Sequence, residues 1–371
     1  MDPPLKYTTI SFYRYFSVDD PQTLCVQIRA LCVCYRIMGR ILIAHEGING
    51  AVSGTNGDIE RLKENLVGII GLDKLTFREQ RADFQTYHKL VVKVRSEVVA
   101  FGFQVNVQNA APTITAQELN MWYDQKKDFV IIDARNEYEY DVGRFKDAVR
   151  LPLHNFREFP SIRGQLEKYK HKKMVLYCTG GIRCEKATAY LKENGFPEVY
   201  HVQGGVIGYL NEEPKNWEGG LFVFDDRLVS PTDKILTFCV HCSTPAVQYY
   251  NCHNLDCDTL FICCLGCADR MRMTCSIGCK SSSRLRKIEV KRQTIAVVEN
   301  YYAKIGIAQV RINQAVSFPH TFMFVGKTTF FEEEIKEACG FDGKVVSDAC
   351  VGDVVTFRIS SKVRKNDLVQ V

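Results

Sequence analysis

One short stretch of the 371-residue chain carries the residues best suited to covalent chemistry. An apolar run leads directly into Cys178, and Gly180 and Gly181 then precede the pattern of a helix. Such a loop directs backbone N–H groups and the positive start of the helix at a sulfur, and Arg183 adds a full charge. The glycines permit the tight curl that this arrangement needs. The spacing therefore predicts a reactive thiol at Cys178.

A plainer interpretation of the same residues stays open. Cys178 could be a buried cysteine at the end of a strand, in a C-x5-C spacing with Cys184, because free cysteine often packs as a small apolar side chain. The residues on either side of the loop make this interpretation weaker than that of a reactive thiol.

Those surrounding residues resemble a rhodanese domain. Upstream lie a strand pattern ending in Asp133-Ala-Arg135 and the pair Glu137-Tyr138, and downstream residues 195–205 are similar to the last strand and Gly-Gly helix start of that family. The resemblance covers about residues 115–215. It implies a catalytic Cys178 in an active loop that also contains Thr179, Gly180, Gly181, Ile182 and Arg183. Four residues separate Cys178 from Arg183, as in the sulfur-transferring loop, whereas the related phosphatase loop is one residue longer; this favours persulfide chemistry.

Composition limits the class of protein. The chain is long enough for two or three domains, and 46% hydrophobic with 25% charged residues is typical of a soluble globular protein. We find no apolar run near the ~18 residues of a membrane span and no apolar core of a signal peptide near Met1, so we expect a cytoplasmic protein without a membrane partner. A net charge of +5 permits a nucleic-acid partner without requiring one. Sixteen cysteines in a reducing compartment indicate metal sites and catalysis.

Nine of the cysteines lie between residues 239 and 279, and eight of them form four closely spaced pairs. Four pairs suffice for two tetrahedral four-thiolate sites, which zinc prefers. We therefore predict two structural zinc ions in a module at residues 236–282, held by Cys239, Cys242, Cys252, Cys257, Cys264, Cys267, Cys275 and Cys279. Alternate use of the pairs is one arrangement that the spacing allows. His241 or His253 could replace a ligand, and an iron–sulfur cluster is the competing interpretation.

Residues 1–110 follow a β-α-β-β-α-β pattern, which predicts a ferredoxin-like (acylphosphatase-like) sandwich. Strands are expected near residues 8–16, 40–53, 75–79 and 90–95, and helices over 21–35 and 56–70. His45, Glu46 and Asn49 cluster at the turn between two strands, where polar side chains often bind ligands. The alternative is a capped hairpin with a satisfied histidine.

The last part of the chain reads differently. Residues 280–292 contain six basic residues and one acid, as in a connector that can also contact phosphate. Residues 293–371 alternate short strands with polar turns, which predicts a small β-barrel similar to the second domain of elongation factor Tu. The fold class is thus multidomain α/β and α+β. Such a barrel implies contact with tRNA or with a translation-related or sulfur-donor protein.

Taken together, the segment Ala44-His-Glu-Gly-Ile-Asn49, the Cys178 loop and the cysteine-rich block resemble the bacterial tRNA uridine(34) hydroxylases over about residues 7–280. The resemblance implies an oxidoreductase that hydroxylates C5 of the wobble uridine with dioxygen as co-substrate, giving 5-hydroxyuridine, and that depends on Cys178. We see no flavin, nicotinamide, haem or iron-oxygenase motif in the sequence. Two other functions stay open: a sulfurtransferase that passes a persulfide sulfur to an acceptor, and a zinc-stabilised RNA-binding adaptor.

A tRNA anticodon loop with a splayed base needs basic and aromatic groups near the reactive sulfur. Arg183 and Lys186 flank the loop, and Arg14 lies between two tyrosines. We therefore add Arg14 and Lys186 to His45, Glu46 and Asn49 as candidate substrate-binding residues. Each has a plainer alternative, because tyrosines on a strand usually pack and lysines usually face solvent.

Overall fold

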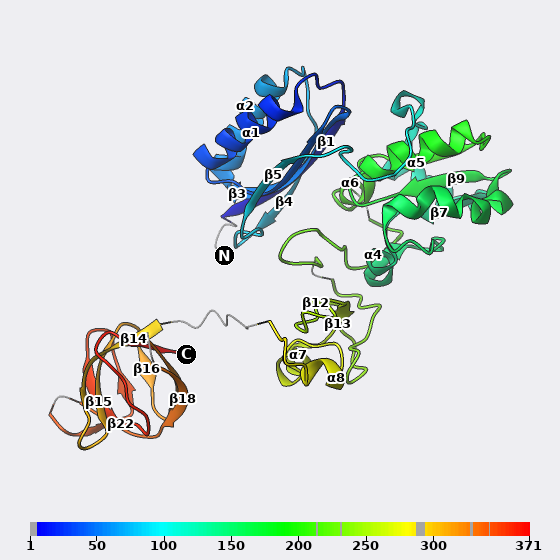
Figure 1. Ribbon diagram of the computed structural model, residues 1–371. Helices are drawn as coiled ribbons and strands as arrows, with labels where there is room; N and C mark the ends of the chain where they lie inside the picture. The colour runs from blue at the N-terminus through cyan, green and yellow to red at the C-terminus, as the bar shows by residue number, and fades with distance from the viewer. Residues whose placement is uncertain (1–5, 213, 231, 287–293, 327–328, 341) are drawn as a thin grey trace. The chain divides into compact units, whose positions relative to one another are not determined.

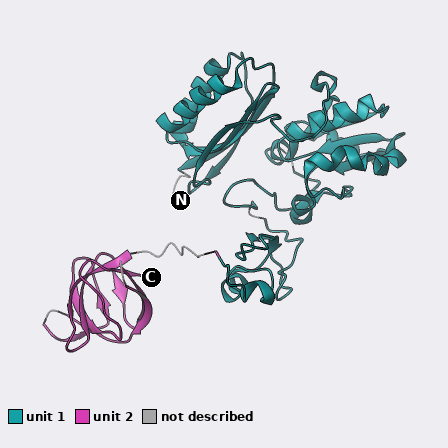
Figure 2. Ribbon diagram, in the orientation of Figure 1, with its two compact units in different colours: residues 1–285 teal, residues 286–371 magenta. Residues whose placement is uncertain are grey.

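The computed structural model describes residues 6–212, 214–230, 232–286, 294–326, 329–340 and 342–371 (Figure 1). The chain divides into two compact units, residues 1–285 and 286–371 (Figure 2). Residues 287–292 of the basic connector lie outside the described residues. Within the described ranges, none of the helices combines the length and the apolar character that crossing a membrane requires.

The first part of unit 1 is a ferredoxin-like mixed sheet of order β4-β1-β3-β2-β5, with α1 and α2 on one face (Figure 1). Its elements are β1 (Tyr7–Tyr15), α1 (Pro21–Cys34), β2 (Met38–Ala44), β3 (Gly47–Thr55), α2 (Asn56–Ile70), β4 (Phe77–Ala82) and β5 (Leu90–Val94). Local signals fix the helix ends: Asp20 caps α1 ahead of Pro21, and Thr55 caps α2. Along β1, Ile10 and Phe12 belong to the core, while Thr9, Ser11 and Tyr13 alternate with them and line a cavity.

The second part is a parallel α/β sheet of order β6-β10-β9-β7. The strands β7 and β9 read as nearly continuous apolar runs because both faces of the sheet are buried. Its elements are β6 (Thr113–Ile114), α3 (Ala116–Asp124), β7 (Phe129–Asp133), α4 (Glu137–Val142), β8 (Gly143–Phe145), the 3-10 segment η2 (Phe156–Tyr169), β9 (Lys173–Tyr177), α5 (Ile182–Glu193), β10 (Val199–Val202) and α6 (Gly205–Leu210), preceded by η1 (Val107–Asn109). The strand β11 (Trp217–Gly219) then pairs with β8.

The cysteine-rich part has little regular structure. A two-stranded ladder of β12 (Tyr249–Asn251) and β13 (Leu260–Ile262) is followed by two short helices, α7 (Leu265–Arg270) and α8 (Ile277–Lys280). Eight of the residues packed in its core are cysteines, so thiols replace much of the apolar core that a segment of this size would otherwise need.

Unit 2 is an antiparallel half-barrel of eight strands in the order β18-β17-β23-β14-β15-β22-β19-β20, with the small ladder of β16 and β21 beside it. The strands are β14 (Thr294–Tyr302), β15 (Ile307–Ile312), β16 (Val316–Ser317), β17 (His320–Val325), β18 (Phe330–Ile335), β19 (Ala338–Cys339), β20 (Val345–Val346), β21 (Asp348–Ala349), β22 (Val354–Arg358) and β23 (Leu368–Gln370). Unit 2 has a separate hydrophobic core, which includes Val298, Val310 and Phe324.

These sheets confirm the predicted fold class: a ferredoxin-like mixed sheet, a parallel α/β sheet where the resemblance to a rhodanese domain implied one, two cysteine clusters and a C-terminal antiparallel half-barrel. The strand β5, which was expected near residues 90–95, runs parallel to β2 at the edge of the first sheet. It gives this sheet one strand more than the four of a β-α-β-β-α-β pattern. The finer division of the chain into four domains at the expected boundaries stays a prediction.

Candidate active site

The loop that carries Cys178 joins the end of β9 to the start of α5. Two N–H groups at the start of α6 bind the loop carbonyls: Val206 N donates to Cys178 O at 2.9 Å, and Ile207 N to Thr179 O at 3.1 Å. Only glycine fits at position 205, because a Cβ there would lie 2.5 Å from Cys178 O. With two of its carbonyls held by α6, the loop directs the Gly181 N–H at Cys178 Sγ, at 3.1 Å.

Cys178 is fully buried yet lines a cavity, so a reactant must enter that cavity to reach the sulfur. Burial alone would raise the pKa of Cys178. The hydrogen bond from the Cys184 thiol, the charge of Arg183 and the N–H groups of Cys184 and Gly181 outweigh it and lower the pKa to about 5. The thiolate is therefore the form of Cys178 at neutral pH.

The guanidinium of Arg183 is fixed by two polar neighbours. Its Nη1 and Nη2 donate to Glu139 Oε2 and Oε1 at 2.6 and 2.8 Å, and Nη2 also donates to Thr179 Oγ1 at 3.0 Å. Burial raises the pKa of the Glu139 carboxyl, but the charge of Arg183 more than offsets this and lowers it. Glu139 thus stays ionised and holds a permanent positive charge beside the thiolate.

A cavity of about 680 Å³ opens over the sulfur. One wall is the face of the N-terminal sheet opposite its helices, and the other is the Cys178 loop with segments 155–157 and 223–225. The ring of Phe224 is 54% exposed and lies 5.7 Å from the Arg183 guanidinium carbon, measured from the ring centroid. The volume falls in the ~300–1,000 Å³ range of ligand pockets.

The two walls are joined at Tyr13. Its hydroxyl donates to Glu185 Oε1 at 2.7 Å, and Arg78 lies over its ring at 5.3 Å. The same hydroxyl closes over Gly181, where a Cβ would lie 2.8 Å from it. A residue of β1 thus contacts the first turn of α5 directly beside the reactive loop.

The predicted substrate-binding residues occupy different places. Asn49 lines the large cavity, with its Nδ2 donating to Val98 O at 2.9 Å, and Arg14 lines a smaller hollow of about 220 Å³ next to Tyr13. His45 is exposed, and its Nδ1 lies 2.9 Å from Val18 O. Of the five predicted residues, the structure therefore brings only Asn49 to the cavity that contains Cys178.

Lys186 and Glu46 contact each other. Lys186 Nζ lies 2.9 Å from Glu46 Oε1 and 2.7 Å from Glu97 Oε2, and the lysine is only 2% exposed. Glu46 also accepts the Val98 N–H at 2.8 Å. These contacts link α5 to the N-terminal sheet.

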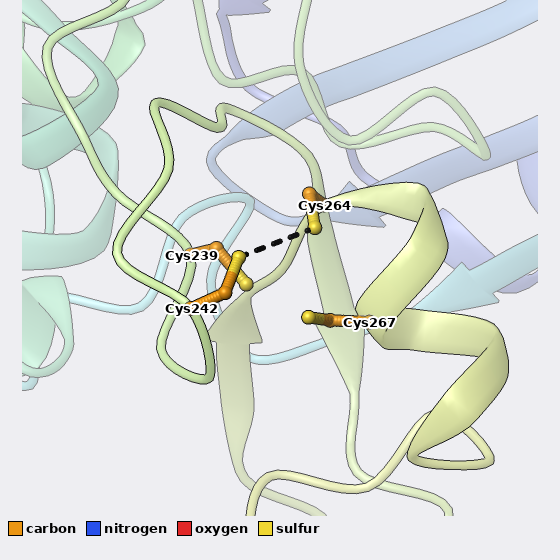
Figure 3. A group of neighbouring side chains, drawn as sticks. All are labelled: Cys239, Cys242, Cys264 and Cys267. Atoms are coloured by element: carbon orange, nitrogen blue, oxygen red, sulfur yellow. Dashed lines mark hydrogen bonds between the residues drawn. The ribbon is translucent and has the colours of Figure 1, made fainter.

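The eight paired cysteines form two groups of four. In the first group, Cys239 and Cys242 face Cys264 and Cys267 (Figure 3). The members of the second group are Cys252, Cys257, Cys275 and Cys279. Within each group all sulfur atoms lie within 4.8 Å of one another. The alternate use of pairs that the spacing allowed is the arrangement found. His241 instead has its Nε2 2.9 Å from the backbone oxygen of Thr274.

Both groups have the dimensions of a metal site. Four sulfurs at about 2.3 Å from a tetrahedrally bound zinc ion lie about 3.8 Å apart. The closest sulfur pairs here are separated by 3.7 Å, for Cys242–Cys264, Cys257–Cys275 and Cys275–Cys279. Each group could hold one metal ion.

Comparisons with known proteins match the N-terminal sheet, the parallel α/β sheet and the cysteine-rich part to known families. Family models match in chain order: the UPF0176 acylphosphatase like domain over residues 7–98, the rhodanese-like domain over 115–212 and the rhodanase C-terminal domain over 218–280. The chain is 36% identical over 324 residues to the tRNA uridine(34) hydroxylase of Cronobacter sakazakii, with 84% of this chain and 92% of that protein covered. The chain belongs to the tRNA uridine(34) hydroxylase family.

Other members of the family agree. The tRNA uridine(34) hydroxylase of Chlamydia abortus is 37% identical over 293 residues, which cover 76% of this chain and 89% of that protein. Among solved structures, the chain is similar to a rhodanese-like domain protein from Staphylococcus aureus, with 27% sequence identity and a TM-score of 0.23. The alignment covers 26% of this chain and 90% of that protein's chain. The last of the three family models ends at residue 280, before the half-barrel of unit 2.

Sequence reasoning did not select several residues of this site. Glu139 was visible only as part of the rhodanese-like stretch after Asp133-Ala-Arg135, and Cys184 only as the second member of a C-x5-C spacing. For Arg78 and Phe224 the sequence offers no signal, because they reach the cavity from β4 and from a segment after β11.

Proposed function

We propose that this protein hydroxylates uridine 34 of tRNA at C5 with dioxygen, giving 5-hydroxyuridine, and that the Cys178 thiolate is the reacting group. Its relatives are named tRNA uridine(34) hydroxylases. The observation that carries the role of Cys178 is its position: a thiolate at the wall of a cavity large enough for a base, held by fixed N–H donors and a fixed cation.

The chemistry follows from uracil itself. A thiolate that adds to C6 of the ring makes C5 electron-rich, so that C5 can form a bond to dioxygen. The Gly181 N–H and Arg183 then stabilise the sulfur anion before it adds and again when it leaves. We place the base in the cavity with C6 toward Cys178.

The cavity wall supports a position for the splayed base. The exposed ring of Phe224 offers a stacking surface next to Arg183, and the amide of Asn49 faces the same space. Arg157 and Arg78 also line the cavity and could contact phosphates of the anticodon loop. Arg14, in the adjoining hollow, is proposed as a further phosphate contact.

His45, Glu46 and Lys186 remain proposals as substrate contacts, with weaker support. Lys186 is buried against two carboxylates, so its charge is already compensated before a substrate binds. We propose that Glu46 and Lys186 act mainly by holding the N-terminal sheet over the loop.

We further propose that each four-cysteine group holds a structural zinc ion, because the sulfur spacing fits zinc and the segment has little other core. Zinc bound there would fix the fold of residues 239–279 and take no part in the reaction. As a tRNA enzyme with sixteen free cysteines, the protein is proposed to work in the cytoplasm. The half-barrel of unit 2 is proposed to contact tRNA or a translation-related partner.

A sulfurtransferase is the second candidate. The same N–H donors at Cys178 that stabilise a thiolate would also stabilise a persulfide. The two functions differ in their product, because one adds oxygen to a uridine and the other moves sulfur from a donor such as thiosulfate to an acceptor.

The deciding experiment incubates unmodified tRNA with the reduced protein in air and under nitrogen, digests the tRNA and measures 5-hydroxyuridine by mass spectrometry. We expect product in air only, and none with the Cys178→Ala variant. Absence of product with wild-type protein, together with turnover of thiosulfate and cyanide, would replace the hydroxylase by the sulfurtransferase.

A further inference from the structure

A second thiol lies against the reactive sulfur. Cys184, in the first turn of α5, is fully buried, and both its N–H and its thiol hydrogen-bond to Cys178 Sγ. Its own N–H also donates to Gly181 O at 3.0 Å, which fixes the backbone of this turn. Gly181 thus links the two cysteines, because its N–H donates to Cys178 Sγ at 3.1 Å and its carbonyl accepts the Cys184 N–H.

The two thiols are chemically unequal. Burial, followed by the hydrogen bond and the negative charge of Cys178, raises the pKa of Cys184 well above that of an ordinary thiol. Cys178 is thus the anion and Cys184 the proton donor of the pair. In such a pair the ionised sulfur is the first nucleophile, and the protonated sulfur reacts only in a later step.

The pair is also isolated from the other cysteines. Of the sixteen, three lie in α1, nine between residues 239 and 279, and two in unit 2. Cys178 and Cys184 are the two cysteines of the rhodanese-like domain at residues 115–212, and both belong to one of its hydrophobic cores. A disulfide formed by Cys178 within the site can therefore use Cys184 without disturbing the metal-binding groups.

The proposed reaction needs electrons that a uridine alone does not supply. Reduction of dioxygen to a hydroxyl on C5 and one water takes four electrons, of which oxidation of the C5–H bond gives two. Two more must come from a donor at the site.

We infer that Cys178 and Cys184 form a redox pair that supplies these two electrons and ends each turnover as an intramolecular disulfide, an inference that rests on the proposed function. In sum, one uridine, one dioxygen and two thiols give one 5-hydroxyuridine, one water and one disulfide.

The bonds can be followed one by one. The Cys178 sulfur adds to C6, and C5 bonds to dioxygen and takes up a proton to become a hydroperoxide. The Cys184 sulfur takes the outer oxygen, so the O–O bond breaks and a sulfenic acid forms. Loss of the C5 proton expels Cys178 from C6 and releases 5-hydroxyuracil. Cys178 then attacks the Cys184 sulfur, and hydroxide leaves as water.

The disulfide must be reduced before the next turnover. Because both sulfurs are buried and Cys178 is the one that lines the cavity, we assign this step to a dithiol reductant that reaches Cys178 through the cavity once the product has left. In solution dithiothreitol takes this role.

The test is a single turnover without free thiol. Protein reduced and desalted under nitrogen is mixed with unmodified tRNA in air-saturated buffer, and 5-hydroxyuridine and the Cys178–Cys184 disulfide are counted by mass spectrometry. Wild-type protein is expected to stop at about one product and one such disulfide per chain, to form little disulfide without tRNA, and to resume on addition of dithiothreitol. Cys184→Ser is expected to give less than about a tenth of a product per chain.

The matched control is Cys25→Ser, which replaces a buried thiol of α1 that is distant in sequence from the reactive loop. This variant is expected to keep the full burst. A full burst from Cys184→Ser, or wild-type product without the disulfide, would overturn the inference while leaving the proposed function intact. No product from wild-type protein even with dithiothreitol in air would instead remove the proposed function. If Cys184→Ser fails to fold, as judged by lost tRNA binding, the wild-type disulfide count still decides.

Discussion

Arg183 and Glu139, which are 44 residues apart in sequence and lie on two different helices, form a buried bidentate ion pair with Nη–Oε distances of 2.6 and 2.8 Å. Thr179 adds a third bond, from its hydroxyl to Glu139 Oε1 at 3.0 Å. The pair binds α4 to the first turn of α5 and keeps one positive charge next to Cys178. It therefore links the stability of the loop to the reactivity of the thiol.

The first prediction separates these two contributions. Arg183→Gln removes the charge beside Cys178 and leaves Glu139 buried without its partner. We expect the pKa of Cys178 to rise, with its alkylation by iodoacetamide at pH 6 falling about tenfold if the pKa rises by about two pH units, and the free energy of unfolding to drop by about 3 kcal/mol.

The double variant Arg183→Gln/Glu139→Gln should recover most of the stability but none of the thiol reactivity. The matched control is Arg157→Gln, at an exposed arginine of the same cavity. Equal loss of reactivity in the control would contradict a specific role for Arg183.

The second prediction concerns pH. Because the pKa of Cys178 is about 5, the thiol is protonated and unreactive below that pH and ionised above it. Its alkylation rate, followed on the Cys178 peptide by mass spectrometry, should rise through pH 5 and stay flat from about pH 6 to 8. An ordinary cysteine would instead rise through about pH 8.5. A short unstructured peptide with one cysteine, added to the same sample, provides that comparison.

The third prediction compares two neighbouring glycines. Gly181 has φ +102°, and a Cβ there would lie 2.8 Å from the Tyr13 hydroxyl, whereas a Cβ at Gly180 meets no atom within 4 Å. Gly181→Ala should cost about 1–3 kcal/mol of stability from backbone strain and slow alkylation of Cys178. Gly180→Ala should fold and react like wild type.

Adding Tyr13→Phe to Gly181→Ala removes the close contact but not the strain, so only part of the loss should return. Full recovery in this double variant would show that the contact alone matters. Unfolding in denaturant and the alkylation rate are the two measurements.

Local signals in the sequence account for much of the fold. Asp20 before Pro21 and Thr55 before Asn56 mark helix starts because their side chains accept the first free N–H groups, and Gly71 ends α2 in the left-handed conformation. The apolar run before Cys178 likewise predicts a buried parallel strand. Each of these depends on residues within one or two turns of chain.

The cavity depends on distant residues and could not be read in this way. Tyr13 and Glu185 are 172 residues apart, and their contact follows from how one sheet packs against another domain's helix. The same packing explains why Lys186 and Glu46, which looked like substrate contacts from their positions at a loop and a turn, bond to each other. Cysteine spacing gave the number of metal groups, whereas the alternate pairing required the fold.

The fourth prediction tests that packing. Lys186→Met removes the cation from between Glu46 and Glu97, which are partly exposed, so we expect a loss of about 2 kcal/mol. Lys192→Met, at an exposed lysine of the same helix, should change stability by less than about 0.5 kcal/mol. Chemical denaturation measures both. Adding Glu97→Gln to Lys186→Met should restore part of the loss.

A loss in Lys186→Met no larger than in the Lys192 control would mean that the ion pairs do not hold α5 to the N-terminal sheet. Measuring 5-hydroxyuridine formation by the same variants asks whether that packing is needed to close the cavity over a base.

The fifth prediction concerns the metal. Elemental mass spectrometry of the purified protein should find two zinc ions per chain. Cys242→Ala and Cys257→Ala should each lower the zinc content to about one ion per chain, because each variant removes a ligand from a different group. The control is Cys263→Ala, which should keep both ions. The sulfur of Cys263 lies 3.7 Å from Cys239 Sγ but belongs to neither group.

Removal of zinc by a chelator should unfold residues 239–279 first, since thiols form most of their core. Iron and inorganic sulfide in place of zinc would contradict this assignment and identify the groups as cluster ligands.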